Sequence, residues 1–221
     1  MMHQENETDR QRMIERQLVS REITDRRVLD AMLRVPREEF VPPDYRGEAY
    51  DDRALPIAAG QTISQPYTVA FMCQELQLKG TERVLEIGTG SGYGAAVLSL
   101  LAKEVYTIER IAELSEHAAE TLQRLGCHNV TCGVGDGSHG WPEYAPFDAI
   151  VATASSPALP EPYKQQLADG GRIVIPIGPT RAHQAMMRFT LQQGHWHIED
   201  LGNFAFVPLI GDYGWQRDRD E

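Results

Sequence analysis

Three glycines, at positions 88, 90 and 92, alternate with other residues directly after residues 84–87, which are apolar except for the acidic Glu86. An apolar run that ends in a glycine cluster indicates a buried strand, and the residues that follow position 94 are good helix formers. Glycine has no Cβ, so the backbone here can turn sharply and come close to a ligand. A strand, a glycine turn and a helix together form the first unit of a nucleotide-binding α/β sheet.

Two acidic residues flank this turn and indicate its ligand. Glu86 lies two residues before Gly88, and Glu109 follows the next expected strand, 109 − 88 = 21 positions after that glycine. A carboxylate at the first place repels phosphate and attracts an amine, whereas an acid at the second suits a ribose diol. Tyr93 stands where a dinucleotide fingerprint has its third glycine. The pattern resembles the Rossmann-like methyltransferases, which implies S-adenosyl-L-methionine; the alternative is a turn that only closes a βα unit.

The composition is that of an ordinary globular chain. Of its 221 residues 42% are hydrophobic and 24% are charged, and the net charge is −11 with no basic stretch. This charge argues against a nucleic-acid partner. Three cysteines form no C-x-x-C pair, and neither an export signal nor a membrane-spanning run is visible. We therefore expect a single cytoplasmic domain over residues 1–221, monomeric and without a membrane partner.

Strands and helices are expected to alternate through most of the chain, with a pair of strands at the end. The expected strands are residues 84–87, 105–108, 129–134, 147–151, 172–177, 185–190 and 203–207. The expected helices cover residues 13–18, 24–33 with Thr24 as the cap, 66–78, the region after 94, 111–125 and 163–167. This order predicts a doubly wound, mostly parallel, seven-stranded α/β sheet with an antiparallel edge strand. N-terminal helices and a long connector occupy residues 1–60 and the catalytic core residues 61–211, whereas residues 1–8 and the tail 212–221 are expected to be loose or disordered.

A second motif identifies a family. Residues 60–66 read Gly-Gln-Thr-Ile-Ser-Gln-Pro, and with residues 84–93 they resemble protein-L-isoaspartate O-methyltransferases. Further matches are residues 35–37, 54–57, 135–137, 145–148 and 206–209. They occur in the family's order from about residue 15 to 215. Two departures, Ala58-Ala59 in place of Gly-Gln and Ser155-Ser156 in place of Ala-Pro, concern peptide preference more than reaction type.

The resemblance implies methyl transfer from S-adenosyl-L-methionine, leaving S-adenosyl-L-homocysteine, to the α-carboxylate of L-isoaspartyl and D-aspartyl residues in damaged proteins and peptides. The methyl ester then closes to a succinimide, which begins repair. Ser64 is the expected catalytic positioning residue. The expected substrate-binding residues are Thr62, Ile63, Gln65, Val207 and Pro208. The expected cofactor-binding residues are Glu86, Gly88, Thr89, Gly90, Ser91, Gly92, Tyr93, Glu109, Arg110, Asp136 and Gly137.

The chemistry itself requires no general base, because a carboxylate with a pKa of about 4 is ionised at neutral pH. It requires alignment and neutral hydrogen-bond donors, which Ser64 and the start of the following helix offer. Other interpretations remain open at this point. Ser64 could only cap that helix, Asp136 could be a turn residue, and His195, His197 and Asp200 could bind a metal, although we expect none. The competing functions are a small-molecule methyltransferase, a nicotinamide-dependent oxidoreductase and a cofactor-binding module without catalysis.

Overall fold

A seven-stranded sheet forms the centre of the computed structural model, which describes residues 2–180 and 183–216. Its strand order is β5-β4-β3-β6-β7-β8-β9. The strands are β3 (Arg83–Ile87), β4 (Glu104–Glu109), β5 (Val130–Val134), β6 (Phe147–Ala152), β7 (Leu167–Thr180), β8 (His183–Gln192) and β9 (His195–Phe204). β3 to β7 pair in parallel, whereas β8 and β9 run antiparallel at one edge. The predicted fold class is therefore confirmed.

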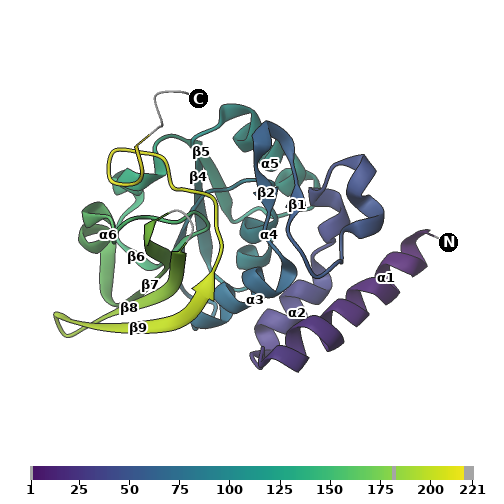
Figure 1. Cartoon of the computed structure of the whole chain (residues 1–221), viewed down its shortest axis with the longest axis horizontal. Coiled ribbons are helices and arrows are strands. Elements are labelled where there is room, and N and C mark those ends of the chain that lie inside the picture. The colour runs from purple at the N-terminus through teal and green to yellow at the C-terminus, as the bar shows by residue number, and fades with distance from the viewer. Residues whose placement is uncertain (1, 181–182, 217–221) are drawn as a thin grey trace.

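Helices precede and separate these strands. They are α1 (Met2–Met13), α2 (Arg26–Arg34), α3 (Pro66–Glu75), α4 (Tyr93–Ser99), α5 (Ala112–Arg124) and α6 (Glu161–Gln166). Figure 1 shows α1 and α2 on the side of the molecule away from the β8–β9 hairpin. A small antiparallel pair, β1 (Leu55–Pro56) and β2 (Thr62–Ile63), lies in the connector that leads to α3. Within the described residues, no helix is both long and apolar enough to cross a membrane.

The central strands are buried on both faces. Successive side chains of a strand point to opposite faces, and a doubly wound sheet covers both. Val84, Val151 and Val174 belong to a hydrophobic cluster that includes the buried side chains of the N-terminal helices. Their neighbours along the strands belong to a second cluster, which includes Leu209 and the α6 residue Tyr163. The near-continuous apolar runs of the sequence reflect this two-sided burial.

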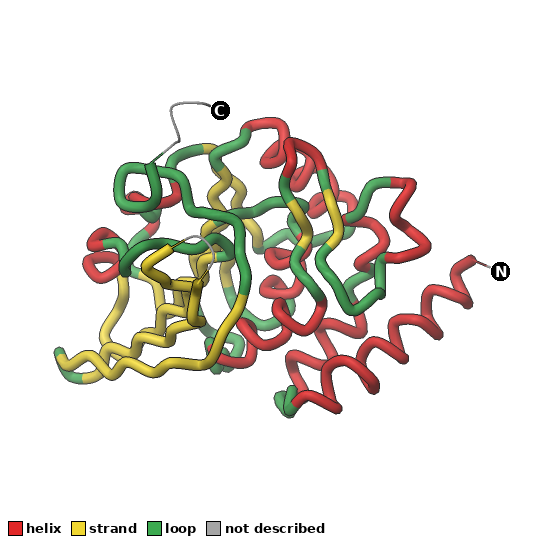
Figure 2. Tube along the Cα trace, in the orientation of Figure 1, coloured by secondary structure: helices red, strands yellow, loops and turns green. Residues whose placement is uncertain are grey.

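The topology determines where a ligand can bind. From β3 the chain proceeds outward through β4 and β5, and it then returns to the other side of β3 to form β6 and β7. This reversal creates a crevice at the carboxyl ends of β3 and β6, the usual ligand position in an open α/β sheet. The loops that leave these strand ends can be followed in Figure 2. The glycine turn after β3 therefore lies at the switch point.

The structure corrects two expectations near the N-terminus. Residues 2–8 are not loose but lie in α1, whose Gln, Glu and Arg residues favour helix. Arg10 also anchors this helix, because its side chain donates hydrogen bonds to the Tyr50 hydroxyl (2.9 Å) and the Leu33 carbonyl (2.9 Å). The cap of α2 is Asp25 and not Thr24, because the Asp25 carboxylate accepts from the N–H groups of residues 27 and 28.

The expected last strand was also placed wrongly. It runs over His195–Phe204 instead of residues 203–207, because the turn at residues 193–194 leads straight back along β8. Residues 205–207 follow β9 and belong to no strand. The tail 212–221 was expected to be disordered, but residues 212–216 belong to the described part of the chain. One of them, Trp215, accepts a hydrogen bond at its carbonyl from the Gly211 N–H (3.2 Å). The last five residues of the tail, 217–221, lie outside the described part of the chain.

Candidate active site

A cavity of about 940 Å³ opens at the carboxyl ends of the central strands. Its lining comes from the glycine turn after β3, the start of α3 and the segment that follows β9. All the site residues predicted from the sequence line this cavity, except Gly92 and Asp136. The predicted residues that it brings together are Thr62, Ile63, Ser64, Gln65, Glu86, Gly88, Thr89, Gly90, Ser91, Tyr93, Glu109, Arg110, Gly137, Val207 and Pro208.

The glycine turn needs glycine for two distinct reasons. Gly88, Gly90 and Gly92 all have positive φ angles, of 93°, 53° and 90°, which L side chains rarely adopt. In addition, a Cβ at Gly88 would overlap the hydroxyl of Thr153, which donates to the Gly88 carbonyl at 2.8 Å. A Cβ at Gly92 would lie 3.1 Å from that of Ala118 in α5. Gly92 therefore allows helix packing and does not face the cavity.

Glu109 ties the end of β4 to the glycine turn. Its Oε2 accepts the N–H of Gly90 at 3.0 Å, and its Oε1 accepts the N–H of Ile111 at 3.1 Å. The side chain is only 7% exposed, yet it lines the cavity. A carboxylate oxygen can accept more than one hydrogen bond, so each oxygen keeps capacity for a ligand hydroxyl. This position is compatible with the ribose contact expected from the sequence.

Glu86 is a carboxyl group buried almost completely at the end of β3, with 1% exposure. Its Oε2 accepts from the Thr107 hydroxyl at 2.6 Å, and the hydroxyls of Thr107 and Thr89 are 2.7 Å apart. Gly94 leaves room for Oε1, because a Cβ there would overlap it. Burial raises the pKa of Glu86 to about 8. The hydrogen bond from Thr107 lowers this pKa, and the charge of Glu109 raises it, but both effects are smaller than that of burial. The group is therefore protonated at neutral pH until a cation is placed beside it.

Ser64 and Gln65 lie at the other end of the cavity, where α3 begins. Gln65 is the N-cap residue and Pro66 occupies the first helical position, as the sequence predicts. No side chain caps this helix. The Ser64 hydroxyl has no hydrogen-bond partner among the described residues, so the interpretation of Ser64 as a mere helix cap is not supported. Both the hydroxyl and the first N–H groups of α3 remain available to a ligand.

The segment that contains Val207 and Pro208 is fastened to the end of β6. The Ser155 N–H donates to the Val207 carbonyl (2.8 Å), and the Leu209 N–H donates to the Ser155 carbonyl (2.7 Å). Ser155 is completely buried. One of the two departures from the family pattern therefore lies directly beneath the segment expected to contact substrate.

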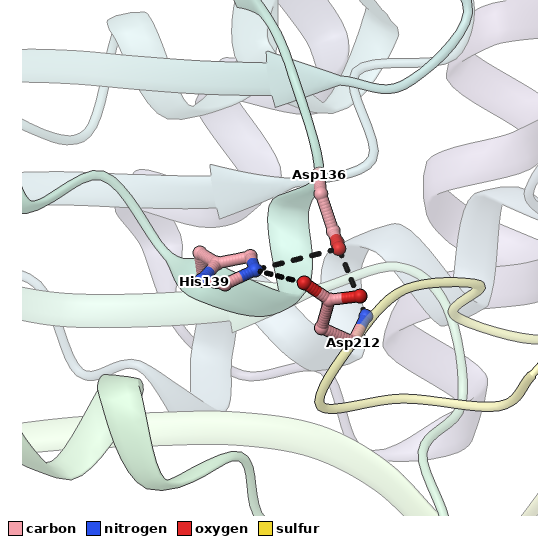
Figure 3. Close-up of side chains that lie close together, drawn as sticks. All are labelled: Asp136, His139 and Asp212. Atoms are coloured by element: carbon pink, nitrogen blue, oxygen red, sulfur yellow. Dashed lines mark hydrogen bonds and ion pairs between the residues drawn. The ribbon is translucent and has the colours of Figure 1, made fainter.

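Asp136 does not line the cavity, and its side chain lies beside Asp212 of the C-terminal segment and His139 (Figure 3). Its carboxylate accepts the N–H groups of Ser138 (2.9 Å) and Asp212 (2.9 Å), and Nε2 of His139 lies 2.9 Å from Asp212 Oδ2. Burial opposes ionisation, but these hydrogen bonds and the charge of His139 hold the pKa of Asp136 below its ordinary value. Its neighbour Gly137 lines the cavity. The expected place of Asp136 near the adenine stays a prediction.

In the described part of the chain, Asp136, His139 and Asp212 are the one group that brings three potential metal-ligand atoms within 4.8 Å of one another. They already hydrogen-bond to each other or to the backbone. His195, His197 and Asp200, considered from the sequence as ligands, do not form such a group among the described residues. The alternating strand positions in β9 explain their spacing.

Sequence reasoning missed Thr153 and most of an aromatic wall, of which only Phe206 lies in a stretch that the sequence singled out. Thr153 follows the apolar strand β6, and only the topology brings it against Gly88. The wall consists of Tyr67 and Phe71 from α3 and Phe204 and Phe206 from the end of β9 and beyond, and all four line the cavity. The rings of Phe71 and Phe204 are 5.0 Å apart. The spacing of Tyr67 and Phe71, four residues apart, could have predicted that both rings lie on one face of α3. Their contact with Phe204 could not be predicted without the correct position of β9.

Known proteins resemble this chain over most of its length. A family model described as protein-L-isoaspartate(D-aspartate) O-methyltransferase matches residues 8–214. A protein-L-isoaspartate O-methyltransferase of Dictyoglomus turgidum is 55% identical over 194 residues, 88% of each chain. A solved structure of a protein with that name has a TM-score of 0.84 at 31% identity, covering 93% of this chain and 67% of the other. A Plasmodium falciparum protein described in the same way, solved in complex with S-adenosyl-L-homocysteine, has a TM-score of 0.79 at 26% identity, with coverages of 93% and 98%.

The buried Glu86 carboxyl group should make stability depend on pH. Between its ordinary pKa of 4.5 and the folded value of about 8, the folded state binds a proton that the unfolded chain has lost. Stability without ligand should therefore fall as pH rises through this window, by on the order of a few kcal/mol. The isosteric variant Glu86→Gln should lack this component. Urea unfolding from pH 5 to 8 would measure the free energy of unfolding of the wild type and of Glu86→Gln. If this free energy changed with pH in the same way for both proteins, the raised pKa of Glu86 would be contradicted.

Proposed function

The chain belongs to the protein-L-isoaspartate(D-aspartate) O-methyltransferase family, and we propose that its cavity joins the cofactor half and the substrate half of one methyl-transfer site. It is an enzyme that methylates the α-carboxylate of isoaspartyl residues in proteins and peptides. The observation that carries the proposal is the shared cavity: Ser64 and the start of α3 line it together with Glu86, Glu109 and the glycine turn. A site for a bimolecular transfer must hold both reactants in one enclosure.

In the cofactor half, Glu109 receives the ribose hydroxyls and Glu86 faces the amino group of the methionine moiety. S-adenosyl-L-methionine supplies an electrophilic methyl group on a sulfonium. The raised pKa of Glu86 favours this ligand, because a fully buried carboxyl group ionises readily only beside a cation. A dinucleotide offers a pyrophosphate at the corresponding place and no cation. The residues therefore fit S-adenosyl-L-methionine better than NAD.

In the substrate half, neutral groups hold the carboxylate. The Ser64 hydroxyl and the N–H groups at the start of α3 can donate hydrogen bonds without forming an ion pair, which leaves the carboxylate nucleophilic. The nucleophile is already ionised at neutral pH, since its pKa is about 4. The site therefore needs neither a general base nor a metal ion. Its task is to align a carboxylate oxygen behind the methyl carbon and to exclude water.

The substrate backbone is held on the other walls of the cavity. Thr62 and Ile63 of β2 and the segment with Val207 and Pro208 line it together with Ser64. An isoaspartyl α-carboxylate is one methylene closer to its chain than an aspartyl side-chain carboxylate. A site that fixes the backbone and the carboxylate together can therefore distinguish the two by reach.

We also propose that the enzyme acts in the cytoplasm as a monomer, with protein and peptide substrates and no nucleic-acid or membrane partner. The net charge of −11 disfavours phosphate backbones. Its three cysteines are all unpaired, which suits a reducing compartment.

Two peptides of identical composition, one aspartyl and one isoaspartyl, test the function directly. With labelled S-adenosyl-L-methionine, kcat/KM for the isoaspartyl peptide should exceed that for the aspartyl peptide by several orders of magnitude, because a misplacement of about 1 Å spoils an in-line displacement. Equal methylation of both peptides would identify a general carboxyl methyltransferase. Methylation of neither, with intact binding of S-adenosyl-L-homocysteine, would favour a small-molecule substrate.

Ser64→Ala should lower turnover far more than it lowers cofactor affinity, because the hydroxyl addresses the substrate carboxylate. A lost positioning contact at a reacting centre can reduce kcat/KM on the order of 100-fold. Steady-state kinetics with the isoaspartyl peptide and calorimetry with S-adenosyl-L-homocysteine separate the two effects. Full turnover of the variant, whatever its thermal stability, would remove Ser64 from the proposed role.

A further inference from the structure

Arg37 carries a charge that is completely buried behind Ser64. Its Nη2 donates to the Ser64 carbonyl at 2.7 Å and its Nε to the Ala49 carbonyl at 2.7 Å, while the guanidinium lies 4.8 Å from the ring centre of Tyr93. Its Nη1 has no hydrogen-bond partner. Although burial lowers the pKa of Arg37 to about 10, the group is still charged at neutral pH.

Such an arrangement is costly for the fold. Among the described residues, no carboxylate forms an ion pair with Arg37, and its neighbours are neutral carbonyls and phenols. A buried cation without a counter-ion destabilises the folded state. A role in packing alone therefore does not explain why a charged arginine is buried at position 37. Its hydrogen bond to the Ser64 carbonyl indicates a role in the site.

The contact determines the direction of one peptide group. The carbonyl of Ser64 and the N–H of Gln65 belong to the same planar trans peptide, so they point in opposite directions. Arg37 holds the carbonyl on the core side, which turns the N–H away from the core. Both residues line the cavity, and the Gln65 N–H has no hydrogen-bond partner among the described residues. A hydrogen bond from a guanidinium to the carbonyl also polarises the peptide and strengthens the N–H as a donor.

We propose that Arg37 is a positioning residue of the transfer site: it holds the Ser64–Gln65 peptide so that the Ser64 hydroxyl and the Gln65 N–H both face the substrate carboxylate. This inference rests on the function proposed above. Arg37 contributes a buried positive charge behind these donors, and the two donors that hold the carboxylate, the Ser64 hydroxyl and the Gln65 N–H, are themselves neutral. The anion is thereby attracted to the site without a direct ion pair.

The competing explanation is that Arg37 only ties Ala49 of the connector to α3. Arg10 provides a matched control for it. Arg10 also donates to a backbone carbonyl, that of Leu33, and its guanidinium lies 5.7 Å from the ring centre of Tyr50. It stabilises the same N-terminal layer but does not reach Ser64. Arg10 differs in one respect, because it also forms an ion pair with Glu38 at 3.3 Å. If Arg37 only stabilised this layer, both variants should keep the wild-type kinetics under conditions where both are folded.

The experiment compares Arg37→Lys with Arg10→Lys, each measured with the isoaspartyl peptide at a temperature where both are folded. Lysine keeps the charge, but its single ammonium cannot reproduce the two-point grip on Ala49 and Ser64. Arg37→Lys should lower kcat/KM for the peptide by about 10-fold to 100-fold, the scale of one lost hydrogen bond to a charged group. Arg10→Lys should keep the wild-type kinetics. Calorimetry with S-adenosyl-L-homocysteine should give similar affinities for both, which separates the substrate effect from any disturbance of Tyr93.

A double-mutant cycle with Ser64→Ala then tests whether Arg37 acts through Ser64. If it does, the fold-loss caused by Arg37→Lys should be smaller in the Ser64→Ala background than in the wild type. Wild-type kinetics for Arg37→Lys would overturn the proposal. An equal fold-loss in both backgrounds would overturn the part that concerns the Ser64 hydroxyl, because Ser64→Ala keeps both the carbonyl that Arg37 holds and the Gln65 N–H. Wild-type protein that fails to methylate the isoaspartyl peptide would instead overturn the proposed function.

A second pair of variants leaves Arg37 intact, in case its replacement prevents folding. Gln65 has φ = −50°, close to the value that proline requires, so Gln65→Pro removes the N–H with little backbone strain. Gln65→Ala removes the side chain and keeps the N–H. Gln65→Pro should have a kcat/KM about 10-fold or more below that of Gln65→Ala. Equal values for the two variants would show that this N–H does not serve the substrate and would contradict the proposal.

Discussion

The burial of the Glu86 carboxyl group is the constraint on which the cofactor half of this site depends. The hydroxyl of Thr107 reaches its Oε2, and a glycine at position 94 is required beside its Oε1. Burial raises the pKa of this carboxyl group to about 8, so it is neutral at pH 7 unless a cation lies beside it. The same glycine turn that accommodates Glu86 also receives Glu109 through the Gly90 N–H. The turn therefore favours a ligand that combines an ammonium group with a ribose, which agrees with the family of the chain.

The substrate half has the complementary charge pattern. A buried cation, Arg37, lies behind the neutral donors of Ser64 and Gln65, so an anion is attracted there without direct pairing. In the proposed function, the two halves together bring a carboxylate nucleophile and a sulfonium electrophile into one cavity. No proton needs to be transferred, because the nucleophile is ionised in water. This explains why alignment, and not acid–base chemistry, dominates the architecture.

Local patterns predicted most of this organisation. The strand, the glycine turn and the helix around residues 84–99 were recognisable because their periodicity and composition agree with their environment. β9 was misplaced because an exposed edge strand with many polar residues lacks the apolar alternation of a buried one. Features that depend on long-range contacts could not be read locally. Examples are Thr153 against Gly88 and the rotation of Asp136 toward residue 212.

We propose that neutral donors at the start of α3 receive the substrate carboxylate. A crystal structure of the protein with S-adenosyl-L-homocysteine and an isoaspartyl peptide would show this contact directly. We expect the α-carboxylate within hydrogen-bond distance of the Ser64 hydroxyl and the Gln65 N–H, with Arg37 still bound to the Ser64 carbonyl. A carboxylate that is instead ion-paired with Arg21 or Arg53, which also line the cavity, would contradict it.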